Sequence, residues 1–396
     1  MFYNRELFLI NGCKKTNFLI KGDPIMKKTF IIFLLSLLFL FSFNFCAMGG
    51  ADQNRVQLAI LLDTSGSMEG LIEQAKTQLW KIVNELSRAS KRGESINLEV
   101  ALFEYGKDSI PQDEGYLRMI LPFTTDLDKI SDELFKLRTN GGEEYCGEVI
   151  RSAVKNLNWS KDDENLKIIF IAGNEPFTQG EFHYKTSCYK AETKGIIVNT
   201  IFCGNYQEGI STKWKDGADL TNGRYMNIDH NQQIVHISAP QDRILIKLGI
   251  KLNTTYIGYG IRGKAKKEMQ QEQDANAMSL DEAVMADRAI VKGSKQYKNS
   301  SWDLVDAESE GKVKVEELSE NELPEEMKEM TVEERKRYLN EKVKERETIQ
   351  KEINELNEAR RIYVAEKMEE MGDNTLDAVM IKAIRAQAEA KNFKFN

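Results

Sequence analysis

The stretch LAILLDTSGSM, residues 58–68, constrains the fold more than any other part of the sequence, because an apolar run ends there directly in polar residues. Nearly every position of VQLAILLD is apolar, which is typical of a strand in a sheet covered on both faces. An apolar stripe at helical spacing follows over about residues 70–90. These segments predict a strand and a helix, with Asp63, Ser65 and Ser67 in the loop between them.

The alternation of β-rich runs and helical segments continues to about Gly260. Further strands are predicted at NLEVALFEYG, LRMILPF, LKIIFIAG, GIIVNTIFC and GRYMNID, and helices near 127–137 and 145–157. This order implies right-handed βαβ units and an α/β fold with a doubly wound, mostly parallel, Rossmann-like sheet covered by helices. Ligands bind such sheets beyond the carboxyl ends of the strands, which is where Asp63 is predicted to lie.

The three polar residues after the first strand have a structural alternative, because serine and aspartate favour turns and helix N-caps. Three oxygen-bearing side chains at alternate positions, directly before an amphipathic helix, favour a ligand-binding role instead.

Residues 264–396 are predicted to form a helical region that follows the α/β domain at 54–260. One helix is expected in MSLDEAVMADRAIVKG, with Ser279 and Glu282 as its capping box. A long helix is expected over about 331–371, with Thr331 and Glu334 as its capping box. It stops at Gly372, and a helix over about 375–391 packs back on it as a hairpin.

The long helix carries a coiled-coil-like apolar pattern that charged residues interrupt. Leu339, Ile349 and Ile353 fall near heptad a and d positions, but Arg346 and Arg360 fall there too. Such a seam is poor for an autonomous two-stranded coiled coil. The charges most simply indicate a solvated helix face, and a charged partner-binding strip is the alternative.

The first fifty residues have the order of an export signal. Residues 26–50 contain two lysines, an apolar run and then small residues, which predicts a secretory signal peptide beginning at Met26. Residues 1–25 are interpreted as an over-extended start. Three outcomes remain open: cleavage near Ala47, lipid attachment at Cys46, or an uncleaved anchor. Each places the body of the protein outside the cytoplasm, in the periplasm or cell envelope, and the last two give its only membrane association.

Composition and the remaining motifs exclude several classes of function. The net charge of −7 and the absence of a basic patch argue against nucleic-acid binding. Cys146, Cys188 and Cys203 allow one disulfide in an oxidising compartment, or are buried thiols. His183 and Cys188 do not make a convincing nucleophilic pair, because no general base, orienting group or oxyanion donor accompanies them. The protein is therefore predicted not to be an enzyme.

The order of these motifs resembles a known family. Asp63-Thr64-Ser65-Gly66-Ser67 matches the D-x-S-x-S signature of the von Willebrand factor type A (VWA) domain. Gly141-Gly142, the turn after IFIAGN and the segment TNGRYMNI follow in the family's order. The segments AGNEPFTQG, NSSWDLVDA and VEERKRYL also resemble an exported, largely uncharacterised bacterial group of VWA proteins.

The resemblance implies a metal-ion-dependent adhesion site, abbreviated MIDAS. In the family a Mg²⁺ or Mn²⁺ ion is held by the aspartate through water and by both serines, which here are Asp63, Ser65 and Ser67. A threonine and an aspartate from two other loops complete the site. Small divalent cations prefer such oxygen ligands, and an open coordination position favours an Asp or Glu from a partner protein.

This chain departs from the family's pattern in two loops. Glu143 and Glu144 follow Gly141-Gly142, where the family has threonine, and Asn174 and Glu175 stand where the third-loop aspartate belongs. All four side chains can supply oxygen ligands, but more bound carboxylate weakens the attraction of an external one. Alternatively, the two glutamates only favour the N-terminus of the next helix.

The sequence therefore predicts an exported protein that mediates metal-dependent protein binding or adhesion through a MIDAS-like site. The alternative is a scaffold protein of the envelope, in which the metal site is degenerate and the C-terminal helices contact the partner.

Overall fold

The computed structural model describes residues 54–228, 236–371 and 376–395. Residues 52–396 group as one compact unit. The predictions for residues 1–25, for the signal at 26–50 with Cys46, and for the helix stop at Gly372 fall outside the described residues. In the described ranges, no helix combines the length and the apolar character needed to cross a membrane.

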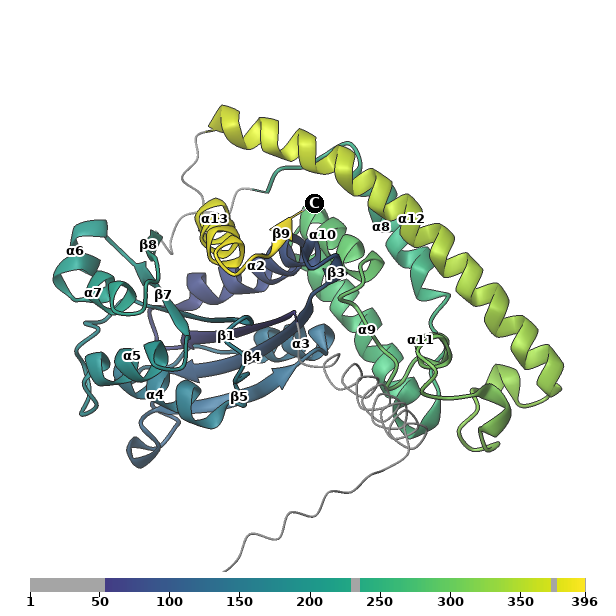
Figure 1. The fold of residues 1–396 in the computed structure, drawn as a ribbon, viewed down its shortest axis with the longest axis horizontal. Helices are drawn as coiled ribbons and strands as arrows, with labels where there is room; N and C mark the ends of the chain where they lie inside the picture. Colours follow the sequence, from purple (N-terminus) through teal and green to yellow (C-terminus); the bar gives the residue numbers. More distant parts are fainter. Residues whose placement is uncertain (1–53, 229–235, 372–375, 396) are drawn as a thin grey trace, which may run out of the picture. The chain divides into compact units, whose positions relative to one another are not determined.

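The centre of the fold is a sheet with the strand order β5-β4-β1-β6-β7-β8 (Figure 1). Its strands are β1 (Arg55–Asp63), β4 (Asn97–Tyr105), β5 (Leu117–Thr124), β6 (Leu166–Gly173), β7 (Ile197–Cys203) and β8 (Tyr225–Ile228). Neighbouring strands are parallel except β4 and β5, which are antiparallel. The predicted doubly wound, mostly parallel sheet is confirmed.

Helices cover both faces of this sheet, which explains the continuous apolar run of β1. The first helices are α2 (Glu69–Ser87), α3 (Leu127–Lys136), α4 (Cys146–Asn156), α5 (Tyr184–Glu192), α6 (Tyr206–Ser211) and α7 (Trp214–Asp219). Leu58 and Leu62 pack in one core with α2 and α3. Ala59 and Leu61 point to the other face and pack with α4, α5 and α7. Successive strand side chains alternate between faces, so both sets must be apolar.

The C-terminal helices complete one of these two cores. They are α8 (Asp242–Asn253), α9 (Gly260–Leu280), α10 (Glu282–Gly293), α11 (Leu304–Ser309), α12 (Val332–Met371) and α13 (Leu376–Glu389). Ile290 of α10 and Ile384 of α13 are fully buried in the same core as α2. The helices after residue 264 are therefore packed into the fold that carries the sheet.

In the described residues, the fold also contains a small second sheet and three short 3₁₀ turns. A second, small antiparallel sheet joins β3 (Glu94–Ser95), β2 (Ala89–Lys91) and β9 (Lys394–Phe395). Single 3₁₀ turns lie at Gln112–Glu114, Val315–Glu317 and Glu325–Met327. Through β9, the end of the described chain is tied to the residues that follow α2.

One of the two predicted capping boxes is confirmed and the other is wrong. The Thr331 N–H donates to Glu334 Oε2 at 2.8 Å, and the Glu334 N–H donates to Thr331 Oγ1 at 3.3 Å. Ser279 instead lies in the last turn of α9, where its hydroxyl donates to the Asn276 carbonyl. Asp281 caps α10 by accepting from the Ala283 N–H at 2.7 Å. The sequence shows a single polar-to-apolar transition there, whereas two helices meet at Asp281.

The two arginines at the heptad positions of α12 form ion pairs with buried aspartates. Arg346 Nη1 lies 2.7 Å from Asp303 Oδ2, and Arg360 Nη1 lies 2.8 Å from Asp287 Oδ1. Both arginines are buried, so the prediction of a solvated face holds only for the outer side of α12. Within the described ranges, α12 packs mainly on α8 and α10, and α13 packs on α2 and β8, so the predicted hairpin is not seen there as a pair of packed helices.

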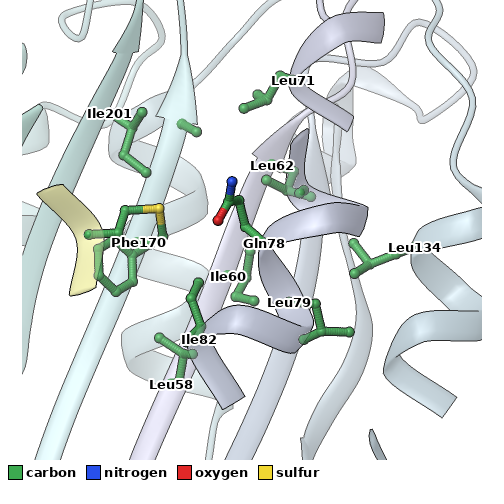
Figure 2. Close-up of a pocket in the computed structure, with 13 residues that line it drawn as sticks. Leu58, Ile60, Leu62, Leu71, Gln78, Leu79, Ile82, Leu134, Phe170 and Ile201 are labelled. Atoms are coloured by element: carbon green, nitrogen blue, oxygen red, sulfur yellow. The ribbon is translucent and has the colours of Figure 1, made fainter. Parts of the chain in front are cut away.

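A small apolar cavity of about 50 Å³ lies between α2 and the sheet. Figure 2 shows the amide of Gln78 among apolar side chains that include Ile60, Leu62 and Phe170. Within the described residues, the buried Oε1 atom of Gln78 has no hydrogen-bond partner. Gln78 is thus a polar defect in the core that α2 makes with the sheet.

Candidate metal centre

Asp63 is the last residue of β1 and its side chain is fully buried. Its Oδ1 atom accepts a hydrogen bond from the Ser65 N–H at 2.7 Å. Its Oδ2 atom is buried and has no hydrogen-bond partner among the described residues. Burial raises the pKa of Asp63 to about 7, against the opposing effect of Ser65, and the charge of Glu175 contributes to the rise. Among the residues that the structure describes, none of the main effects on this carboxylate comes from a cation.

Two hydroxyls and an amide lie next to this carboxylate. Ser65 Oγ and Ser67 Oγ are 3.5 Å apart. Asn174, which directly follows β6, donates from Nδ2 to Ser67 Oγ at 3.1 Å. Its Oδ1 atom is buried and, in the part of the chain that the structure describes, accepts no hydrogen bond. The loops after β1 and β6 therefore converge at the carboxyl ends of neighbouring parallel strands.

The N-cap alternative does not account for these residues. Helix α2 begins at Glu69 after Met68, and no side chain caps it by a hydrogen bond. The contact of Asp63 Oδ1 with the Ser65 N–H is a local turn contact. It occupies one carboxylate oxygen and leaves the second without a structural role.

The loop before α4 turns its two glutamates in different directions. Gln179 accepts from the Glu144 N–H at 3.0 Å and donates to the exposed Glu143 carboxylate at 3.2 Å. Glu144 is buried, and burial raises its pKa to about 8, with further contributions from the charges of Asp63 and Glu175. Neither glutamate caps α4 by a side-chain hydrogen bond. Glu144 faces the carboxylate of Asp63, and Glu143 faces the surface.

Glycines line the Asp63 carboxylate on two sides. A Cβ atom at Gly106, where φ is +76°, would lie 2.8 Å from Asp63 Oδ1 and 2.8 Å from Glu144 Cγ. A Cβ atom at Gly173 would lie 3.0 Å from Asp63 Oδ2 and 2.5 Å from the Tyr105 hydroxyl oxygen. The Asp63 and Glu144 side chains thus meet over the Cα of Gly106. In the sequence, these glycines are marked only by their position at the ends of the predicted strands NLEVALFEYG and LKIIFIAG.

The donor set fits a hard cation only if hydroxyl and amide oxygens take part. Among the described residues, no group of three or more His, Cys, Asp or Glu side chains is arranged to hold a metal. The oxygens brought together are the Asp63 carboxylate, the Ser65 and Ser67 hydroxyls and the Asn174 amide, with Glu144 beside them. Small divalent cations accept such mixed oxygen ligands. The unpartnered Oδ atoms of Asp63 and Asn174 make the site compatible with a cation.

The cysteines and the histidine that the sequence offered as candidates do not form a reactive site. Cys146, Cys188 and Cys203 are free and buried, so the possible disulfide is not formed. Burial raises the pKa of Cys188 to about 12, opposite to the requirement for a nucleophile. His183 is exposed and caps α5, accepting at Nδ1 from the Lys185 N–H. The residues described give no nucleophilic Cys/His arrangement at this position.

The chain thus has an α/β fold in which polar side chains cluster where neighbouring parallel strands of the central sheet end. Residues 57–215 match the family model of the von Willebrand factor type A domain. This chain therefore contains a VWA domain. VWA domains commonly mediate metal-dependent protein–protein interaction, often bind a divalent cation at a MIDAS, and are generally interaction modules and not enzymes. No curated protein matches the chain.

Several solved structures are similar to somewhat less than half of this chain. The conserved hypothetical protein BatB from Bacteroides thetaiotaomicron is 18% identical, with a TM-score of 0.34 over 44% of this chain and 90% of that one. The SpRpn10 VWA domain is 14% identical, with a TM-score of 0.33 over 46% and 98% of the two chains. Proximal thread matrix protein 1 from the mussel byssus, with a zinc-occupied MIDAS, is 11% identical, with a TM-score of 0.35 over 45% and 43%.

Proposed function

We propose that this VWA domain binds Mg²⁺ or Mn²⁺ through Asp63, Ser65 and Ser67 and uses the ion to capture an Asp or Glu side chain of a partner protein. The observation that carries the proposal is the buried Oδ2 atom of Asp63, which has no hydrogen-bond partner among the described residues. Burying an ionised carboxylate without a counter-charge is costly. A cation beside it removes that cost.

Two further residues are proposed as ligands because their polar atoms are buried at the same place. Asn174 offers the Oδ1 atom, and Glu144 offers a carboxylate next to Asp63. Glu143 is the weaker candidate, because it is exposed and bonded to Gln179. Glu175 influences Asp63 through its charge and would be an outer ligand of the ion. In this arrangement the ion supplies a positive charge and a coordination position for the partner's carboxylate.

The residues around the ion would each have a distinct task. Ser65 and Ser67 are neutral and leave the positive charge of the ion largely uncompensated, which favours an incoming acid. The Gln179 side chain accepts a hydrogen bond from the backbone N–H of Glu144, whose carboxylate is buried. It donates a second one to the carboxylate of Glu143, which is exposed. Gly106 and Gly173 leave the space that the carboxylates occupy.

We also propose that the protein acts outside the cytoplasm, in the periplasm or cell envelope. The support is the sequence of residues 26–50, with its two lysines, apolar run and small residues. Lipid attachment at Cys46 or an uncleaved signal would then give membrane association. Mass spectrometry of the mature N-terminus distinguishes these outcomes.

A scaffold function is the second candidate, and the buried Glu144 favours it. Two protein carboxylates on one divalent ion would neutralise its charge and weaken its attraction for a partner's acid. Partner contacts would then fall to the exposed face of α12. Deleting the C-terminal helices cannot separate the two functions, because α10 and α13 are part of the core. Charge reversal at exposed α12 positions such as Glu355 and Lys351 is the usable test.

The test of the proposed function is partner capture from an envelope extract with and without EDTA, using the wild type and Asp63→Asn. We expect a partner that is lost with EDTA and lost with Asp63→Asn. If the partner is still captured in EDTA and by Asp63→Asn, but is lost after charge reversal on α12, the metal-dependent function is wrong and the scaffold function is supported.

A further inference from the structure

A surface beside the candidate metal centre combines exposed carboxylates with aromatic rings. Glu144, whose side chain lies next to Asp63, is followed directly by Tyr145, which is partly exposed. The rings of Tyr145 and Tyr116 meet edge to face, with their centroids 5.6 Å apart. The metal centre therefore borders, at the next residue of the chain, on a pair of tyrosines.

The turn that carries Glu181 lies directly against Tyr145. Gly180 has a φ of +92°, and a Cβ atom there would lie 2.8 Å from Tyr145 Cγ. Gln179 of the same turn donates from Nε2 to the Glu143 carboxylate at 3.2 Å. Burial raises the pKa of Tyr145, and the charges of Glu143 and Glu181 raise it further. Both carboxylates are exposed, so they are close to this tyrosine and open to a partner.

Glu148 adds a third carboxylate from the first turn of α4. A Cβ atom at Gly115 would lie 3.0 Å from Glu148 Cγ, so the loop that carries Tyr116 packs against it. Arg151 Nη1 lies 3.7 Å from Glu148 Oε1, and the charge of Glu181 also acts on Glu148. These residues form one surface, which we call the acidic–aromatic patch: Tyr116, Tyr145, Glu143, Glu148 and Glu181.

Two carboxylates of the patch carry uncompensated charge. Within the described ranges, neither Glu143 nor Glu181 forms an ion pair. The other basic residues within or just after these loops are engaged elsewhere: they are Lys107 and Arg118, on Glu104, Lys185, on Asp216, and Arg138, on the carbonyls of Phe135 and Leu137. The loop of Lys107 also carries the exposed Asp108, Asp113 and Glu114. The patch is therefore suited to a cation from outside the chain.

Arg151 shows how this surface accommodates a guanidinium group. Its Cζ atom lies 3.7 Å from the centroid of the Phe182 ring, while its Nη1 atom faces Glu148. Aromatic rings and carboxylates both attract a cation. The tyrosine pair offers the same combination together with Glu143 and Glu181.

We propose that the acidic–aromatic patch binds a Lys or Arg side chain of the partner protein, close in sequence to the acid that the metal ion captures. This inference rests on the proposed function, which supplies that acid. A partner segment with one acid and a neighbouring base fits both positions. A segment with several acids would be repelled by Glu143 and Glu181.

The experiment is saturation-transfer difference NMR of short peptides with the full chain in Mg²⁺. Each peptide has a single Asp among glycines and serines, and one Arg is placed at each neighbouring position in turn. The reference peptides carry Glu in place of Arg, or neither residue. We expect at least one Arg placement to bind roughly fivefold tighter than the peptide without Arg, and the Glu placements to bind more weakly.

Variants test whether the patch makes this distinction. Glu181→Gln should reduce the preference for Arg, measured as the ratio of the two dissociation constants, and Glu181→Lys should reverse it toward Glu. Glu192→Gln removes an exposed carboxylate at the far end of α5 and is the matched control, which should keep the preference. Thermal unfolding verifies that each variant is folded. Equal affinity with and without Arg in the wild type, or an unchanged preference in both Glu181 variants, would overturn the inference.

The same titrations separate this inference from the proposed function. If the peptide without Arg binds in Mg²⁺ and is lost in EDTA and in Asp63→Asn, but Arg gives no gain, the proposed function stands and the patch does not bind the partner. If the Arg peptides bind equally well in EDTA and to Asp63→Asn, and Glu181→Lys abolishes that binding, the patch binds a base and the metal-dependent capture is wrong. Absence of binding by every peptide would contradict both.

Discussion

Arg288 of α10 and Asp128 of α3 form a buried ion pair, with Nη1 and Oδ1 2.7 Å apart. Arg288 also contacts Asp274 of α9, which in turn contacts Lys292. The network lowers the pKa of Asp274 to about 2 although burial alone would raise it. It joins a helix of the VWA part to two helices that follow it in the sequence.

This pair predicts that the C-terminal helices stabilise the whole fold. Arg288→Met leaves Asp128 and Asp274 buried without their cation, and breaking a buried pair in this way costs about 3–5 kcal/mol. We expect a loss of that size in the free energy of unfolding by urea. Arg337→Met, at an exposed position, is the control and should stay within about 0.5 kcal/mol of wild type. If the protein unfolds in a single transition and Arg288→Met does not shift its urea midpoint, the C-terminal helices do not stabilise the whole fold.

The metal-free protein should lose stability as the pH rises. The pKa of Asp63 is raised to about 7 and that of Glu144 to about 8. Between about pH 4 and these values the folded protein retains protons that the unfolded chain has released, so stability falls as the pH rises. Asp63 alone accounts for a loss on the order of 4 kcal/mol.

The measurement is urea unfolding in EDTA at about pH 5 and about pH 8. Asp63→Asn should flatten the dependence and should be more stable than wild type at the higher pH. Added Mg²⁺ should restore the wild type most strongly at the higher pH, because the ion competes with protons. Equal pH dependence in the wild type and Asp63→Asn would show that Asp63 is ionised in the folded protein without a cation.

The glycine cradle predicts a specific defect for Gly106→Ala. The residue has a φ of +76°, and the new Cβ would lie 2.8 Å from both Asp63 Oδ1 and Glu144 Cγ. We expect a loss of about 1–3 kcal/mol in stability and a loss of the thermal shift caused by Mn²⁺. Gly93→Ala is the matched control, because Gly93 has a φ of +81° and nothing within 4 Å of the added Cβ. Gly93→Ala should show the backbone strain alone and keep the Mn²⁺ response, so an equal response of the two variants to Mn²⁺ would count against the cradle.

The polar defect in the apolar cavity should be removable. Gln78→Leu replaces an unpartnered buried oxygen by carbon in a site lined by Ile60 and Phe170 (Figure 2). A buried unsatisfied acceptor costs about 1–3 kcal/mol, so we expect a gain of that order in the free energy of unfolding. Gln207→Leu, an exposed glutamine at the start of α6, should have almost no effect. Loss of stability in Gln78→Leu would mean that the amide is satisfied in solution.

Local patterns in the sequence were sufficient to predict the sheet and the first part of the site. The run VQLAILLD predicted a doubly covered strand, and β1 is buried on both faces. The spacing of Asp63, Ser65 and Ser67 predicted three oxygens at one strand end, where the structure places them. Strand alternation and D-x-S-x-S are short-range signals, so they can be interpreted without a tertiary structure.

Local patterns did not predict ion pairs and hydrogen bonds between residues that are far apart in the sequence. Arg346 and Arg360 were interpreted as interruptions of a heptad, because their aspartate partners lie 40 or more residues away. Gln179, which bonds to Glu143 and Glu144, lies 36 and 35 residues from them, in a segment whose resemblance to VWA proteins gave this side chain no role. Their roles depend on which loops meet at the sheet edge, and one sequence does not specify this.

The central claim is that a divalent ion binds at the end of β1. The most direct measurement is an anomalous difference map from a crystal of the protein soaked in Mn²⁺. The account predicts a peak about 2.1 Å from the Ser65 and Ser67 hydroxyls, near Asp63, and no peak in Asp63→Asn. A map without a peak there, with the Glu144 side chain filling the space between Asp63 and the serines, would contradict it.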